Sequence, residues 1–366
     1  MAAGAGGPGG RSEEDVLDAI EARRRRPRRK ILDERITLSH GAGGKSGHDL
    51  VEGVFLRDLG NPLLEPLGDS ALVEAGSERL AFTTDSYVVR PLFFPGGDIG
   101  ELAVNGTIND LAMAGARPLA LSAGFIIEEG FPVSDLERVT ASMAAAAAAA
   151  GVPVATGDTK VVERGKADGL YINTSGVGVV EHDLQLGPRA IRAGDRVIVS
   201  GPVGDHGMAV MIARGDLHLE MDLESDTAAL HRLVAKLIES GAGLHCLRDP
   251  TRGGLATVLA ELSQSAAVGI TLRESAIPVR PEVNGACEIL GIDPIYVANE
   301  GRLVAVVSPE SADAALAVLR SDPLGSEAAI VAEVTAEPPG LVILETALGG
   351  TRVVDMLAGD PLPRIC

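Results

Sequence analysis

Strand-like and helix-like runs alternate along this chain of 366 residues, and the alternation starts afresh in its second half. Residues 80–89 and 169–181 have the pattern of strands, and residues 134–151 predict a long helix. A turn-rich stretch at 181–195 separates them from a second round. Two rounds predict an α/β (α+β) protein with two α/β domains in tandem. The second round comprises a strand at 195–201, helices at 204–215, 226–241 and 253–264, and a strand at 301–308.

The helix expected at 134–151 carries signals at both ends. Ser134, followed three residues later by Glu137, predicts a capping box at its N-terminus. Gly151 predicts its C-terminal stop, because glycine readily adopts the left-handed conformation that ends many helices.

Composition excludes several classes of function. Trp is absent and aromatic residues make up 2% of the chain, so stacking platforms for single-stranded bases are not expected. The formal net charge of -19 repels nucleic acid. No apolar run approaches the roughly 20 residues that span a bilayer, and the N-terminus lacks the apolar region of a signal peptide. We therefore expect a cytoplasmic protein that binds neither nucleic acid nor a membrane, with its core built from Ala, Val, Leu and Ile.

Both ends of the chain differ from the two domains. Residues 1–34 begin with small residues and continue into a run of positive charges, which predicts a disordered or partly helical basic arm. From residue 346 the chain is rich in Gly and Pro, and it ends in Cys366. We expect residues 346–366 to form a mobile tail. The two domains then occupy residues 35–185 and 186–345.

A glycine-rich stretch at 39–46 nearly matches the P-loop pattern, but Ser39 stands where the first glycine belongs. The functional interpretation is a loop whose exposed N–H groups and single cation fold over phosphates. The alternative is an ordinary flexible loop. The residues of this loop that we expect to contact a nucleotide are Gly41, Gly43, Gly44 and Lys45.

Four aspartates in the first half share one setting, at the end of a strand or on a helix and beside Gly, Asn or Thr. Hard oxygen ligands gathered from separate segments suit Mg²⁺ that also holds nucleotide phosphates. One such aspartate is usually a turn or cap residue, but four in one half of the chain favour a metal site. They are Asp69, Asp85, Asp110 and Asp158.

A second candidate site lies where the helix expected at 253–264 begins. A helix N-terminus beside an arginine attracts anions, because its N–H groups are unpaired and its dipole is positive. The alternative is a capped helix with Asp249 or Thr251 as the cap. The residues assigned to anion or nucleotide binding are Thr251, Arg252, Gly253 and Gly254, with Asn109 from the first half.

Seven short motifs, taken in order, resemble the ATP-binding superfamily of aminoimidazole ribonucleotide synthetase. Within it, LSHGAGGK near the start and PRIC at the end most resemble the HypE carbamoyl dehydratases. A selenophosphate synthetase would carry cysteine or selenocysteine by the glycine-rich loop, and this loop has neither. The resemblance covers residues 36–366. The seven motifs are GDSA, TTDSYVV, NDLAMAGARP, GDTK, GPVGDHG, DPTRGGL and NEGR.

The resemblance implies a homodimer formed through the N-terminal sheet, with ATP and Mg²⁺ in a cleft beneath the glycine-rich loop. It also implies a reaction sequence. A HypF-type carbamoyltransferase loads a carbamoyl group onto the sulfur of Cys366, and this protein dehydrates it to a thiocyanate. The cyanide then passes to iron held by a HypC–HypD complex, for a [NiFe]-hydrogenase.

Three residues receive chemical roles in this scheme. Cys366 is the arm that carries the group between partners, and a residue at the chain end can travel where a core cysteine cannot. An amide oxygen leaves poorly, so its phosphorylation by ATP calls for a nearby cation and a base. Lys160 is the candidate cation or proton shuttle, and Glu300 is the candidate base. Both roles are assigned partly by resemblance. The alternative for Glu300, which lies between Asn299 and Gly301 just before a strand, is a surface turn residue.

Two other functions remain open from the sequence. One is a small-molecule synthetase or kinase of the same superfamily, in which Cys366 is incidental. The other is a non-catalytic carrier whose tail only transports a group. ATP turnover distinguishes the carrier from both enzymes, and dependence on the carbamoylated tail distinguishes the two enzymes.

Overall fold

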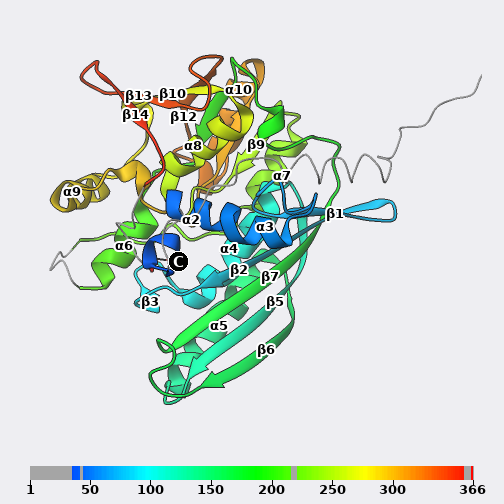
Figure 1. The fold of residues 1–366 in the computed structure, drawn as a ribbon, viewed down its shortest axis with the longest axis vertical. Coiled ribbons are helices and arrows are strands. Elements are labelled where there is room, and N and C mark those ends of the chain that lie inside the picture. The colour runs from blue at the N-terminus through cyan, green and yellow to red at the C-terminus, as the bar shows by residue number, and fades with distance from the viewer. Residues whose placement is uncertain (1–34, 42–43, 216–220, 358–363, 366) are drawn as a thin grey trace, which may run out of the picture.

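The computed structural model describes residues 35–41, 44–215, 221–357 and 364–365 (Figure 1). The arm expected at 1–34, Gly43 and Cys366 lie outside this part of the chain. Two sheets organise the described residues, one of five and one of seven strands, beside a small two-stranded ribbon. None of the helices in the described ranges is long and apolar enough to cross a membrane.

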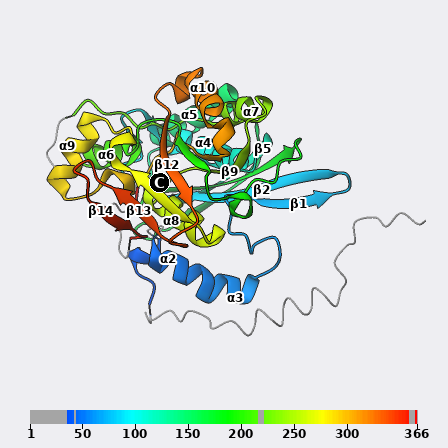
Figure 2. The same ribbon diagram turned by 90° about the horizontal axis from the view of Figure 1, so that it is seen from above.

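The N-terminal domain is a five-stranded sheet with the order β1-β2-β7-β5-β6. Only β5 and β6 run parallel, and the other pairs are antiparallel. Helices α4 (Ile99–Met113) and α5 (Val133–Ala150) lie on one side of the sheet, as Figure 2 shows from above. The strands are β1 (Ala71–Ala75), β2 (Glu78–Tyr87), β5 (Arg117–Glu128), β6 (Val154–Val162) and β7 (Leu170–Val180).

Helix α4 is buried on nearly every side, because it packs against β2 and β7 on one side and the C-terminal domain on another. It begins at Asp98, whose side chain accepts hydrogen bonds from the backbone N–H groups of Gly100 and Glu101. A helix that is apolar all round belongs inside a protein. The polar residues of α4 therefore need partners inside the protein, either within the N-terminal domain or across the boundary with the C-terminal domain.

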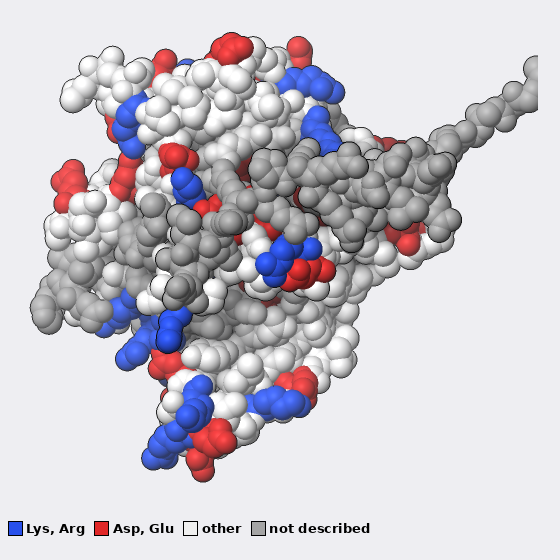
Figure 3. Space-filling view, viewed as in Figure 1, with Lys and Arg blue, Asp and Glu red and all other residues white. Residues whose placement is uncertain are grey.

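The other side of the five-stranded sheet, which we call the open face, is not covered by α4 and α5. Alternate residues of β2 point to it, so Phe82 is half exposed while Ala81 and Thr83 are buried. The register pairs Phe82 with Val177 and Ile126 with Tyr171 on this face. In Figure 3 charged side chains are few over this sheet and gather at its lower tip.

The C-terminal domain is a seven-stranded sheet with the order β14-β13-β10-β12-β8-β11-β9. Alternate residues of β8 serve two cores, since Val197 and Val199 pack with helix α8 while Ile198 packs with helices α7 and α10. Helices therefore cover both faces. The elements are β8 (Arg196–Val199), α6 (Asp205–Ala213), α7 (His231–Glu239), β9 (Leu244–Arg248), α8 (Gly254–Ala266), β10 (Gly269–Arg273), α9 (Pro281–Leu290), β11 (Val304–Val307), α10 (Ala312–Arg320), β12 (Ala329–Thr335), β13 (Val342–Glu345) and β14 (Thr351–Val354).

Short elements precede and join these domains. A 3₁₀ turn at Leu38–Gly41 leads to α2 (Lys45–Leu50), which continues through a π-turn at Val51–Phe55 into α3 (Leu56–Leu59). Strands β3 (Phe93–Phe94) and β4 (Gly97–Asp98) form the two-stranded ribbon. Residues of α4 and α5 share one apolar cluster with residues of α6 and α9, so the two domains have a common core.

Several boundaries differ from those expected from the sequence. Gly151 ends α5 in the left-handed conformation as expected. The helix begins at Val133 after Pro132, so Ser134 lies inside the first turn and no side chain caps it. Helix α7 begins at His231, five residues later than expected from the apolar pattern.

The second domain also extends beyond residue 345, where the tail was expected to begin. Strand β14 pairs with β13 in antiparallel register, and this pairing buries Val354 and Met356. Burial of these two apolar side chains outweighs the local turn signals of the Gly-rich stretch before them. Of the expected tail, residues 358–363 and 366 lie outside the described residues.

Candidate active site

A cavity of about 190 Å³ lies between the two domains. The end of β2 and helix α4 line it on one side, and the segments that follow β9 and precede β11 line it on the other. Most of its lining is polar, which suits a charged ligand. The lining residues are Asp85, Ser86, Tyr87, Gly106, Asp110, Asp249, Thr251, Arg252 and Glu300.

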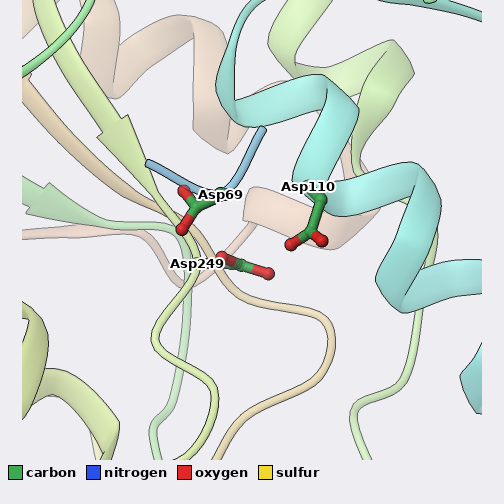
Figure 4. A group of neighbouring side chains, drawn as sticks. All are labelled: Asp69, Asp110 and Asp249. Carbon is green, nitrogen blue, oxygen red and sulfur yellow. The ribbon is translucent and has the colours of Figure 1, made fainter. Parts of the chain in front are cut away.

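Three carboxylates converge beside this cavity, and two of them, Asp110 and Asp249, line it. Asp69 precedes β1, Asp110 lies on α4 and Asp249 directly follows β9. One carboxylate oxygen from each lies within 4.8 Å of the others, and Figure 4 shows the three side chains facing a common space. Segments 180 residues apart in the sequence thus bring hard oxygen donors together, which is the kind of ligand set that Mg²⁺ prefers.

Neighbouring polar groups hold these carboxylates in place. The Thr83 hydroxyl donates a hydrogen bond of 2.7 Å to Oδ2 of Asp110. Arg248 Nε forms an ion pair of 3.0 Å with Oδ1 of Asp69, and both side chains are largely buried. These contacts within the folded chain fix the carboxylates of Asp110 and Asp69.

The electrostatics of the cluster favour a cation. Burial, followed by the charges of Asp249, Asp85 and Asp69, raises the pKa of Asp110 well above its usual range. Burial and the charge of Asp69 raise the pKa of Asp249 to about 8. Carboxylates crowded in this way resist ionisation unless positive charge is supplied. The carboxylate oxygens are ligands that suit Mg²⁺, and a bound Mg²⁺ would offset the repulsion between their negative charges.

Sequence reasoning had treated Asp249 only as an alternative helix cap. Asp249 follows the apolar strand β9 directly, so it shares a strand-end position with the predicted aspartates, although its neighbours are Arg248 and Pro250. Its position after a buried strand was the signal that could have identified it. The four aspartates predicted from the sequence all lie in the first half of the chain, whereas Asp249 comes from the second domain.

Asp85 lines the cavity but stands outside the group of three carboxylates. Burial raises the pKa of Asp85, and the backbone N–H of Ser86 donates to its Oδ1 at 2.7 Å, which partly offsets that effect. Asp85 is thus available to a second cation or to a polar ligand in the same cavity.

Asp158 and Lys160 are not brought to this cavity within one chain. They form an ion pair of 2.7 Å on the edge strand β6, with 70% and 68% of their side chains exposed. The register pairs Asp158 with Gly124 and Lys160 with Ile126, which places both on the open face. Asp85 points to the opposite side of the sheet, because side chains alternate along a strand.

Glu300 is buried, whereas a residue in a surface turn would be exposed to solvent. Its side chain is 3% exposed, and Oε1 has no hydrogen-bond partner. Burial, with the charges of Asp85 and Asp249, raises the pKa of Glu300 well above its usual range. Its backbone N–H donates to Asp226 at 3.0 Å. At Gly301 a Cβ would lie 1.7 Å from the Asp226 carbonyl oxygen, so only glycine allows this close approach.

The expected anion site also faces the cavity. Thr251 and Arg252 line it, just before α8 begins. Gly253 and Gly254 have positive φ angles of 83° and 63°, and a Cβ on Gly254 would lie 2.5 Å from the carbonyl oxygen of Ile295. Gly254 thus allows the start of α8 to pack directly against the backbone of residues 295–297, directly after the cavity-lining Thr251 and Arg252.

The glycine-rich loop is attached to both the site and the end of β14. Arg252 donates a hydrogen bond to the carbonyl oxygen of Gly41. The backbone N–H of Lys45 donates to the carbonyl oxygen of Leu357 at 2.9 Å, and a Cβ on Gly44 would lie 2.2 Å from the same atom. The Lys45 side chain is exposed. The loop follows a 3₁₀ turn rather than a strand, which is not the setting of a P-loop.

Asn109 has a different role from the nucleotide contact expected of it. Its amide nitrogen donates to the carbonyl oxygens of Ala228 and Glu300 at 3.0 and 3.2 Å. Its amide oxygen accepts from the backbone N–H of Leu230 at 2.8 Å. The side chain is 1% exposed, and these bonds use both of its N–H donors and its carbonyl oxygen. The structure therefore uses Asn109 to join α4 to the C-terminal domain.

Replacing Asn109 with Ala is expected to lower the free energy of unfolding by about 3 kcal/mol, because three buried backbone groups lose their partner. Equilibrium denaturation in urea measures this loss. Asn61→Ala is the matched control, since Asn61 also bonds three backbone groups but is exposed. That variant is expected to lose about 0.5 kcal/mol or less. Equal losses in the two variants would contradict the role given to Asn109.

Comparison with known proteins agrees with this architecture. Models of the N-terminal and C-terminal domains of AIR synthase related proteins match residues 67–180 and 192–344. The carbamoyl dehydratase HypE of Rhizobium leguminosarum bv. viciae is 55% identical over 337 residues, which cover 92% of this chain and 96% of that protein.

Two solved structures of HypE proteins are also similar to this chain over most of its length. A HypE–HypF complex matches with a TM-score of 0.80 and 47% identity, covering 84% of this chain and 99% of that one. A structure of HypE in complex with ATP matches with a TM-score of 0.76 and 48% identity, covering 90% and 100%.

Both halves of the chain are thus AIR synthase related domains, and they meet in the link between β7 and β8. Identity at this level over nine-tenths of the chain places it more narrowly: the chain belongs to the HypE family of carbamoyl dehydratases. The fold class and the family resemblance drawn from the sequence motifs are both confirmed.

Proposed function

We propose that the protein uses ATP and Mg²⁺ to dehydrate a carbamoyl group on the sulfur of Cys366 to a thiocyanate, as a step of hydrogenase maturation. Membership of the HypE family and the solved complex of a relative with ATP support the proposal. The observation that carries it is the convergence of three carboxylates and the buried Glu300 on one cavity.

The chain's own residues divide the work of binding. Asp69, Asp110 and Asp249 would hold Mg²⁺, which when bound neutralises charge on the nucleotide phosphates. Arg252, which lines the cavity just before α8 begins, would contact phosphate oxygens through its guanidinium, and the positive end of the α8 dipole would favour the same charge. Asp85, which lines the cavity but is not one of the three, would hold a second cation or orient the ligand.

The chemistry requires removal of an amide oxygen as well as both protons on the nitrogen. In net terms, the carbamoyl thioester and ATP become thiocyanate, ADP and phosphate, so the oxygen leaves on phosphate. The C–O bond breaks only after that oxygen has been phosphorylated. Glu300 would take a proton from the nitrogen, because a carboxylate whose pKa is raised by burial is a stronger base than an exposed one.

The proposed partners lie before and after this step. A HypF-type carbamoyltransferase would load Cys366, and the solved HypE–HypF complex of a relative supports that pairing. An iron scaffold of the HypC–HypD type would then take the cyanide.

The experiment that tests the whole reaction sequence is mass spectrometry of the C-terminal peptide after incubation with carbamoyl donor, carbamoyltransferase and Mg-ATP. It should show a carbamoyl adduct that becomes a cyano adduct only when ATP and Mg²⁺ are present; a carbamoyl mass that persists with both would contradict the function.

We also propose that the protein is a homodimer formed through the open face. This face carries apolar side chains that monomers rarely expose together, including Phe82 at 50% and Ile126 at 43% exposure. Lys160 and Asp158 lie on the same face. A second copy laid against it would bring Lys160 toward the partner, whereas its own cavity lies on the other side of the sheet.

A mixing experiment follows from this placement. Lys160→Ala and Glu300→Gln should each accept the carbamoyl group and fail to dehydrate it. After subunit exchange, about a quarter of all sites in the mixture should be active, because half the dimers are mixed and each mixed dimer has one intact site. The measurement is the fraction of tails converted in one turnover. No activity in the mixture would place Lys160 and Glu300 in the same chain's site.

A further inference from the structure

The last described residues of the chain occupy a socket next to the cavity. Ile365 is 2% exposed and belongs to the same apolar cluster as Val89, Phe94 and Met208. An apolar side chain buried to this extent stabilises its position by about 2 kcal/mol. The chain end is thus held by burial, and Cys366 is the residue that follows.

His206 on α6 holds the backbone of Ile365. Its Nε2 lies 2.6 Å from the Ile365 carbonyl oxygen, and its Nδ1 lies 2.8 Å from the Ser225 hydroxyl. A carbonyl oxygen can only accept, so Nε2 carries the proton and Nδ1 accepts from Ser225. The imidazole is fully buried, and burial lowers the pKa of His206 to about 4. The ring is therefore neutral, with one tautomer fixed by its two partners.

Arg364 is held by separate contacts. Its guanidinium forms an ion pair with Asp168 and donates to the Val88 carbonyl oxygen at 3.2 Å. Its own carbonyl oxygen accepts from the backbone N–H of Arg90 at 3.1 Å and from the Arg214 side chain at 3.2 Å. Arg364 has a positive φ of 58°, which a residue other than glycine keeps only when its surroundings impose it.

The socket and the cavity share one stretch of chain. Residues 85–87 line the cavity, and Val88 and Arg90 directly after them bond to Arg364. Three residues of extended chain span about 10 Å. A tail end fixed at the socket therefore stays within a short reach of the candidate active site.

We propose that His206 is a positioning residue, which fixes the backbone of Ile365 so that the loaded Cys366 is presented to the cavity. This inference rests on the proposed dehydration of the tail. Loading by a carbamoyltransferase needs a free tail and dehydration needs a docked one, so His206 acts on the second step alone.

Hydrogen exchange at the Arg90 amide tests the socket without any activity assay, because that N–H donates to Arg364. In His206→Ala the amide should exchange roughly tenfold faster, as expected when one buried hydrogen bond is lost. His206→Gln should restore slow exchange, since its amide can donate to the same carbonyl. His231→Ala is the matched control, because His231 also lies 3.2 Å from a backbone carbonyl, that of Ala150, but does not touch the tail. A chain truncated after residue 363 gives the undocked rate.

The activity readout then separates positioning from folding. Single-turnover dehydration by His206→Ala should be roughly tenfold slower, with the rate of carbamoyl loading unchanged and both rates normal in His206→Gln. Should His206→Ala fold poorly, Arg364→Ala offers the same test from the tail side. Unchanged Arg90 exchange in the folded variants would overturn the socket. Faster Arg90 exchange together with a normal dehydration rate in His206→Ala would overturn the positioning role. If the wild-type protein does not dehydrate its tail at all, the proposed function is wrong, but the exchange result still tests the socket.

Discussion

Replacing Cys366 with Ser is expected to abolish formation of the thiocyanate while leaving ATP binding and the free energy of unfolding unchanged. The reaction needs a sulfur that accepts the carbamoyl group, and a hydroxyl is a far weaker nucleophile at neutral pH. The measurement is the pair of successive masses on the C-terminal peptide, carbamoyl and then cyano. Calorimetric titration with Mg-ATP checks that the site itself is intact.

The two other cysteines provide the controls. Cys246 and Cys287 are both buried, and burial raises the pKa of their thiols to about 12 and about 11. Thiols held in the protonated form react poorly. Cys246→Ala and Cys287→Ala should therefore keep full chemistry, whatever packing energy they lose. A Cys366→Ser protein that still supplies cyanide would refute self-modification and favour a small-molecule synthetase.

Replacing Glu300 with Gln is expected to slow dehydration by about 10²- to 10⁴-fold, the range associated with loss of a general base. Glutamine keeps the size of the side chain but cannot take a proton. The carbamoyl adduct should therefore accumulate on Cys366, because loading does not involve this residue. Single-turnover kinetics of the carbamoylated protein with Mg-ATP measure the rate.

Glu310→Gln, at an exposed position outside the cavity lining, is the matched control and should dehydrate at the normal rate. Mg-ATP affinity of the Glu300→Gln variant should stay within about threefold of the wild type, since removal of a base acts on the transition state rather than on binding. A normal dehydration rate in this variant would remove Glu300 from the chemistry.

Local patterns predicted the two domains and three of the carboxylates at the cavity, Asp69, Asp85 and Asp110. These three aspartates could be predicted because each lies near the end of an apolar run or on a helix, beside Gly, Asn or Thr. Asp249 was missed because its neighbours at the site come from the other domain, and its position after an apolar strand does not by itself show which residues it meets in space. The position of a residue at a strand end is visible in sequence, but its companions in space are not.

The roles of Asn109 and Lys160 required information of a different kind. Asn109 bonds to groups about 120 and 190 residues away, so its use as a connector depends on how the domains pack. Lys160 has its place set by register: a shift of one residue in the pairing of β6 with β5 would turn it to the other face. Register is a property of paired strands and cannot be derived from one strand alone.

Helix α4 has one further consequence for how reactants enter and leave. Asn109 ties this helix to the C-terminal domain, and the next residue, Asp110, contributes to the carboxylate cluster. Any hinge opening between the domains would break the first contact and pull the second out of place. We therefore expect the two domains to move as one body through the catalytic cycle, with exchange of nucleotide and tail confined to the segments that border the cavity.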